Sequence, residues 1–241
     1  MIPLRDNVPS RGRPVTGLVI IAVTAIVFLY EQSLSQSSLI EFFRTYGLVP
    51  ARFTGADALG VPPGPRLLGL ASAMFLHAGW LHFLGNMWFL WIFGDNVEDH
   101  LGHRRFLVFY LLSGVAAGLA QVLANPSSQL PMVGASGAVA GVMGAYFILY
   151  PRARILTLLP IIFFLTLVEV PAIFFLGIWF VIQFFSGAMT SMARVEGGVA
   201  FWAHAGGFVA GILFLGLLGG WRRPQPPAAR WSRPFTSGWR G

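Results

Sequence analysis

Long apolar stretches alternate with short polar ones along almost the whole chain. Six of these stretches have roughly the 17 to 25 residues that a helix needs to cross the hydrocarbon core of a bilayer. They run over residues 15–30, 74–94, 106–124, 134–150, 171–190 and 199–220. The pattern therefore predicts an all-α membrane protein, a bundle of six transmembrane helices.

A further apolar stretch, residues 155–168, raises the alternative of a seventh crossing. Arginine counting decides against it, because cytoplasmic loops carry an excess of basic residues. With six spans and a cytoplasmic start, twelve of the sixteen arginines lie on the cytoplasmic side, and a seventh span would export the arginine-rich tail. We therefore expect both termini in the cytoplasm, an interfacial segment at 155–168, and a fifth helix that starts near Glu169, which would complement the positive helix end.

This topology divides the chain into three parts. Residues 1–14 form a cytoplasmic N-terminal segment, residues 15–220 the six-helix membrane domain, and residues 221–241 a cytoplasmic tail rich in arginine and proline.

Composition excludes several classes of protein. Hydrophobic residues make up 56% of the chain, charged residues 10%, and the mean hydropathy is +0.70, values that no soluble domain of this size shows. There is no cysteine, so disulfides and thiolate chemistry are excluded. The net charge of +7 is dispersed among loops and tail, which does not favour nucleic-acid binding. No nucleotide motif is present.

Two polar residues at the starts of apolar stretches are the strongest candidates for chemistry. Ser136 lies between Gly134 and Gly137, and His204 precedes Gly206 and Gly207. In isolation, each has a structural interpretation, since membrane serines bond backbone carbonyls and membrane histidines hold helices together. The topology places both near the outer ends of their helices, where together they could act as nucleophile and base.

Small residues at helical spacing accompany both candidates. Gly137 and Gly141 follow the serine, and Gly207 and Gly211 follow the histidine. Such spacing allows close helix approach in lipid. Helix packing without any catalytic role explains the glycine spacing equally well. Here, however, the packing of these two faces would also bring Ser136 next to the imidazole of His204.

His82 and Asn86 lie four residues apart, so they share one face of the second predicted helix. Together with the backbone N–H of Ser136 they could donate hydrogen bonds to an oxyanion; an interhelical hydrogen bond is the alternative. A site of three histidines, His77, His82 and His204, would lack a nearby carboxylate. We expect no metal and no cofactor.

With these motifs assembled, the chain resembles the rhomboid family of intramembrane serine proteases over about residues 15–220. The motifs are Gly134-Ala-Ser136-Gly137, His82-x-x-x-Asn86 and Ala203-His204-x-x-Gly207-x-x-x-Gly211. The resemblance implies a Ser136–His204 dyad without an acidic third member, and an oxyanion hole formed by His82, Asn86 and the Ser136 amide. It also implies a short fourth helix fed by residues 125–133 and a water-filled cavity open to the outer face.

The resemblance further implies the biological setting. Substrates would be single-span membrane proteins cut in or beside the span, admitted through a gate formed by the fifth helix and residues 187–199. The host membrane would be the bacterial cytoplasmic membrane, and lipid the other partner. Two alternatives remain: a catalytically silent relative that acts as a membrane adaptor, which would normally lack Ser136 or His204, and a small transporter, which would need charged groups at the midplane.

One departure from the family concerns the histidine. Family members often carry a tyrosine four residues after the serine, where it stacks on the catalytic histidine, and here that position is Ala140. We expect another aromatic residue, Phe201 or Trp202, to orient His204.

Overall fold

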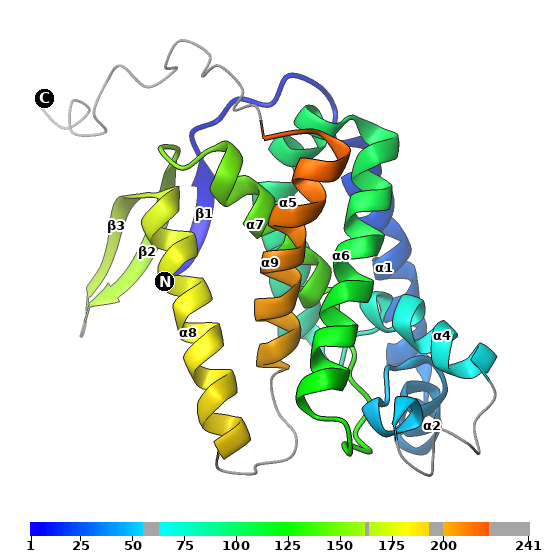
Figure 1. The fold of residues 1–241 in the computed structure, drawn as a ribbon. Coiled ribbons are helices and arrows are strands. Elements are labelled where there is room, and N and C mark those ends of the chain that lie inside the picture. Colours follow the sequence, from blue (N-terminus) through cyan, green and yellow to red (C-terminus); the bar gives the residue numbers. More distant parts are fainter. Residues whose placement is uncertain (55–62, 162–163, 193–199, 222–241) are drawn as a thin grey trace, which may run out of the picture.

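Helices form most of the computed structural model, which describes residues 1–54, 63–161, 164–192 and 200–221 (Figure 1). Residues 193–199 of the predicted gate and residues 222–241 of the predicted tail lie outside the described residues.

Each of the six predicted spans overlaps a helix, although the second, 74–94, is displaced from α5 by several residues. The helices are α1 (Val15–Ser33), α5 (Trp80–Leu101), α6 (His103–Ala124), α7 (Ser136–Leu149), α8 (Ala172–Met192) and α9 (Phe201–Leu218). By length and composition, α1, α6, α8 and α9 could cross a membrane, and α5 makes a fifth span if it is taken with the preceding helix, bent from it by 87°. α7 is a shorter apolar helix of 14 residues. The prediction of a helical membrane bundle is confirmed.

The segment between α1 and α5 contains short helices of its own. These are α2 (Gln36–Tyr46), the 3-10 turn η1 (Pro50–Phe53), α4 (Pro63–Ser72) and the 3-10 turn η2 (Ala73–Phe75). η1 is tied to the chain before α7, because Ala51 N donates to Ser128 O at 3.0 Å and Leu48 exchanges two backbone bonds with Met132. The segment 125–133 is therefore held by protein partners, as irregular backbone at membrane depth requires.

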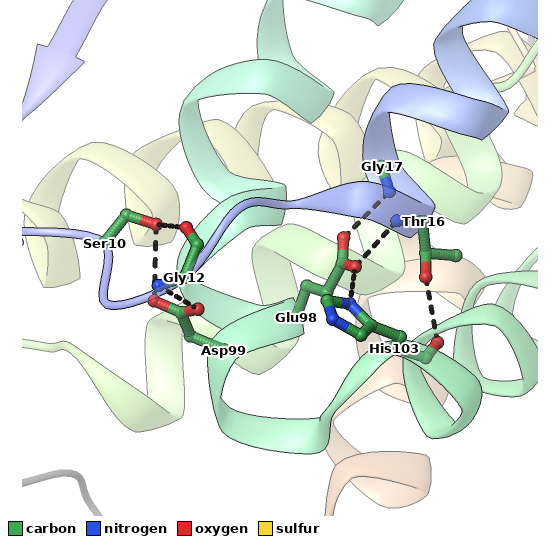
Figure 2. Close-up of polar contacts among 7 residues, drawn as sticks. All are labelled: Ser10, Gly12, Thr16, Gly17, Glu98, Asp99 and His103. Atoms are coloured by element: carbon green, nitrogen blue, oxygen red, sulfur yellow. Dashed lines mark hydrogen bonds and ion pairs between the residues drawn. The ribbon is translucent and has the colours of Figure 1, made fainter.

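Acidic side chains at the end of α5 bind the backbone at and before the start of α1. Glu98, which is 1% exposed, accepts hydrogen bonds from Thr16 N at 2.7 Å and Gly17 N at 2.8 Å, and from His103 Nδ1 at 2.5 Å (Figure 2). Asp99 accepts from Gly12 N at 3.1 Å in the same view. The carboxylate of Glu98 thus satisfies two of the unpaired N–H groups at the start of α1 and complements its dipole.

The two ends of the membrane bundle meet near the end of α5. His100 Nε2 lies 3.2 Å from Gly220 O, just beyond α9, while Glu98 holds the start of α1. The start of α1 and the end of α9 therefore lie on one side (Figure 1). That arrangement agrees with an even number of crossings.

A three-stranded antiparallel sheet, which the sequence did not predict, stands beside α8 (Figure 1). Its strands are β1 (Ile2–Asp6), β2 (Arg154–Ile161) and β3 (Phe164–Pro171), in the order β1-β2-β3. Ile2 pairs with Leu158, and Ile155 pairs with Val170. The apolar segment 155–168 is a hairpin joined to the N-terminal strand, not a helical crossing.

The predicted start of the fifth helix near Glu169 is wrong. Glu169 belongs to β3 and makes an exposed ion pair with Arg154 at 3.4 Å. α8 begins only at Ala172, whose N–H donates to Ala153 O at 2.7 Å. Sheet pairing extends to Pro171, and the base of the hairpin supplies the acceptor for the first turn of the helix.

Candidate active site

Ser136 is the first residue of α7, and the loop before it is held from two directions. Gly134 N donates to Ala73 O at 2.8 Å, and Ala135 N donates to His77 Nε2 at 3.4 Å. Gly134 has φ +130°, a conformation that favours glycine. The hydroxyl therefore stands at a helix start whose backbone is fixed by η2 and His77.

A buried carboxylate supports His77 in turn. Both oxygens of Glu31, on α1, accept from His77 N at 3.3 and 3.2 Å, and both residues are 1% exposed. The sequence placed His77 near the second helix but assigned it no partner. Because its Nε2 already accepts a backbone N–H, His77 supports the loop before Ser136.

The structure brings Ser136 and His204 into contact. Ser136 Oγ lies 2.8 Å from His204 Nε2, across the interface between α7 and α9. A hydrogen bond of this length lets the imidazole take the hydroxyl proton during attack on a carbonyl.

The four predicted glycines lie where α7 meets α9. A Cβ on Gly207 would lie 2.1 Å from Gly137 O, and one on Gly211 would lie 2.0 Å from Gly141 O. Only hydrogen atoms fit at these positions, so the two backbones touch. The close approach sets the distance between the serine and the histidine one turn earlier on α9.

His204 is oriented by α8. Its Nδ1 lies 2.6 Å from Gln183 Oε1, and the ring of Trp179 lies 5.9 Å from the imidazole at an interplanar angle of 33°. Trp202, one of the expected aromatic residues, packs against Phe184 with a ring separation of 5.6 Å. Gln183 was not predicted as a site residue, although a lone amide in the apolar run of α8 was a detectable signal.

His82 and Asn86 line the same cavity as Ser136 and His204, a space of about 580 Å³. Asn86 is buried, and its Nδ2 has no hydrogen-bond partner within the described structure. His82 Nε2 approaches Gly134 so closely that a Cβ there would lie 2.6 Å from it. An unpaired buried donor beside a nucleophile is what an oxyanion site needs before substrate arrives.

The rest of the cavity is largely apolar. Val139 and Met143 extend it along α7, and Phe89 and Trp179 close it from α5 and α8. The arrangement combines a hydroxyl, an imidazole and an unpaired amide N–H donor in a largely apolar cavity, and these are parts of an acyl-transfer site.

Comparison with known proteins gives one family. A family model described as the Rhomboid domain matches residues 65–221, a range that includes all of these polar residues. The chain is 28% identical over 241 residues to the presenilin-associated rhomboid-like protein, mitochondrial, of Mus musculus, covering 97% of this chain and 56% of that protein. It is 30% identical over 154 residues to Rhomboid protein 1, mitochondrial, of Saccharomyces cerevisiae, covering 61% and 40%.

A shorter match is more similar. The chain is 42% identical over 77 residues to Rhomboid-like protein 11, chloroplastic, of Arabidopsis thaliana, covering 32% of this chain and 27% of that protein. The chain thus spans about half, or less, of the length of these curated relatives.

Proposed function

We propose that this chain, which belongs to the rhomboid family, is an intramembrane serine endopeptidase that cuts single-span membrane proteins in or next to their transmembrane segment. The observation that carries the proposal is the 2.8 Å contact between Ser136 Oγ and His204 Nε2 at a cavity of about 580 Å³ among the apolar helices. A serine and a histidine that served only packing would not need to face a cavity lined by an unpaired amide donor.

In the proposed reaction, Ser136 Oγ attacks the scissile carbonyl carbon while His204 Nε2 takes the hydroxyl proton. The carbonyl oxygen becomes an oxyanion that accepts hydrogen bonds from Asn86 Nδ2, His82 and the Ser136 backbone N–H. The C–N bond then breaks, and His204 returns the proton to the leaving amine. Water attacks the acyl-enzyme, gives a proton to His204, and releases the second product as Ser136 regains its hydrogen.

The Ser136 N–H is available for this role because of its place in the fold. The first four N–H groups of a helix have no intrahelical acceptor, and the positive end of the helix dipole favours a negative charge there. Removing one donor of this kind costs roughly 3 to 4 kcal/mol of barrier.

The partners in this proposal are those that the rhomboid resemblance implies. Substrates are single-span membrane proteins and the surrounding medium is lipid, without cofactor, metal, nucleotide or nucleic acid. The chain is an integral membrane protein. The bacterial cytoplasmic membrane remains a prediction, since the relatives named above are mitochondrial or chloroplastic.

The test is cleavage of a model single-span substrate by the purified protein in liposomes. The parent should cut, and Ser136→Ala and His204→Ala should each lose activity while keeping the parent's melting temperature. Cleavage by Ser136→Ala would point to a contaminating protease. A folded parent that cuts none of several substrates would favour the membrane adaptor.

A further inference from the structure

His204 is held at both ring nitrogens by residues from two different helices. Nε2 faces Ser136 on α7 at 2.8 Å, and Nδ1 faces Gln183 Oε1 on α8 at 2.6 Å. Trp179 lies one turn before Gln183 on the same face of α8, and its ring packs against the imidazole at a centroid distance of 5.9 Å. The ring is thereby fixed in position and in rotation.

The chemistry requires one particular tautomer. If Nε2 is to accept the serine proton, the neutral imidazole must carry its own hydrogen on Nδ1, and the group facing Nδ1 must be an acceptor. A glutamine carbonyl oxygen meets that requirement without bringing a charge into the membrane, where a carboxylate is costly.

We propose that Gln183 is the positioning residue of this site, a neutral third member that orients His204 through its side-chain carbonyl. The proposal rests on the proposed function and extends it. When Nε2 takes the proton from Ser136, the Nδ1–H stays bonded to Gln183 Oε1, so the amide dipole also stabilises the transient imidazolium. No proton passes to Gln183.

The position of Gln183 supports a specific role. It is a polar amide in the apolar part of α8, flanked by Ile182 and Phe184. Ile182 is 52% exposed and Phe184 is 44% exposed, whereas Gln183 turns toward α9. A half-buried amide in an apolar helix is costly unless it has a partner, and the partner here is His204.

Three variants test the proposal. Gln183→Met keeps the length of the side chain and removes the strong acceptor. Gln183→Glu keeps an acceptor oxygen and adds a charge. Ile182→Met places the same methionine one residue earlier on the exposed face of α8, as the matched control. Each is measured in liposomes for substrate cleavage, for the rate at which a fluorophosphonate probe labels Ser136, and for thermal unfolding, across a range of pH.

We expect Gln183→Met to lose at least about 10-fold in both kcat and labelling rate, with an unfolding temperature like that of Ile182→Met, because one hydrogen bond that selects the reactive tautomer is gone. Gln183→Glu should recover activity with the acidic limb of its pH profile moved to higher pH, since the carboxylate holds a proton on the imidazole more tightly.

The proposal is overturned if Gln183→Met, folded, has the parent's kcat and pH profile. If that variant does not fold, Gln183→Glu decides alone, and a pH profile identical to the parent's rejects the role. Failure of the proposed function gives a different pattern, in which the parent itself is neither labelled at Ser136 nor active.

Discussion

The contact between α7 and α9 makes Gly207→Ala the most informative single substitution. It adds one methyl group to a helix interior, a change that most positions tolerate. At Gly207 the new Cβ would lie 2.1 Å from Gly137 O, 3.0 Å from Gly137 C and 3.2 Å from the Cβ of Ala117. The obstacles are two atoms of the α7 backbone and a side chain of α6, and no rotamer change can move the backbone.

The displacement follows from these distances. A carbon atom and a carbonyl oxygen rest at roughly 3.3 Å, so α9 must move away from α7 by about 1 Å. His204 lies one turn earlier on α9, and the same movement lengthens its 2.8 Å bond to Ser136 beyond hydrogen-bonding distance. Overpacking of this kind costs about 1–3 kcal/mol of stability, and a misplacement of about 1 Å at a catalytic contact costs about 100-fold in rate.

The assay compares Gly207→Ala with Gly177→Ala, in which the same methyl group is added to α8. There the new Cβ meets only Phe147, at 3.8 Å, an ordinary contact. Substrate cleavage and thermal unfolding, followed by tryptophan fluorescence, should show a large loss for Gly207→Ala and little change for Gly177→Ala. Parent-like activity and stability in Gly207→Ala would refute the backbone contact and the mechanism that depends on it.

Three further predictions concern other parts of the molecule. Asn86→Ala should lower kcat by about 100- to 1000-fold, because the oxyanion loses one donor. The melting temperature should stay unchanged, because Asn86 Nδ2 has no hydrogen-bond partner to lose. A fall in the melting temperature as large as the effect on kcat would contradict the oxyanion role. Burial raises the pKa of Asp6 to about 6, so the folded state binds this proton more tightly than the unfolded one and the parent loses stability as the pH rises from about 4 to 6. Asp6→Asn should remove that part of the pH dependence of the melting temperature. If the melting temperature of the variant changes with pH in parallel with the parent's, the assignment to Asp6 is wrong. Glu98→Ala should lower the unfolding free energy by about 2 kcal/mol or more, since two N–H groups of α1 lose their charged acceptor, whereas exposed Glu41→Ala should leave it unchanged in the same denaturation assay.

The membrane helices could be predicted from the sequence because lipid leaves the backbone few choices. A chain segment in hydrocarbon must satisfy its own N–H and C=O groups, so an apolar run of sufficient length becomes a helix whatever its neighbours do. Local spacing also identified the residues that face the cavity. The four-residue spacing of His82 and Asn86 put them on one helix face, the glycines beside Ser136 marked it as a candidate, and the glycine spacing on α7 and α9 indicated which faces meet.

The sheet could not be predicted in the same way. Residues 155–168 form an apolar run without a period that separates strand from interfacial helix, and the strand that completes the sheet, β1, lies some 150 residues earlier in the chain. Long-range pairing of this kind leaves no local mark, which also explains why Glu169 was assigned to a helix start.

The sequence by itself determined that this protein lies in a membrane, which segments form its helices, and which chemical groups are available to it. Only the tertiary structure decided how those groups combine: Gln183 with His204, Glu31 with His77, Glu98 with the start of α1. Each of these pairs joins polar groups, two side chains in the first case and a carboxylate with backbone N–H groups in the other two, within a largely apolar bundle. Such groups must find one another, but which partner each finds depends on how the helices pack, and that is set by contacts spread over the whole bundle.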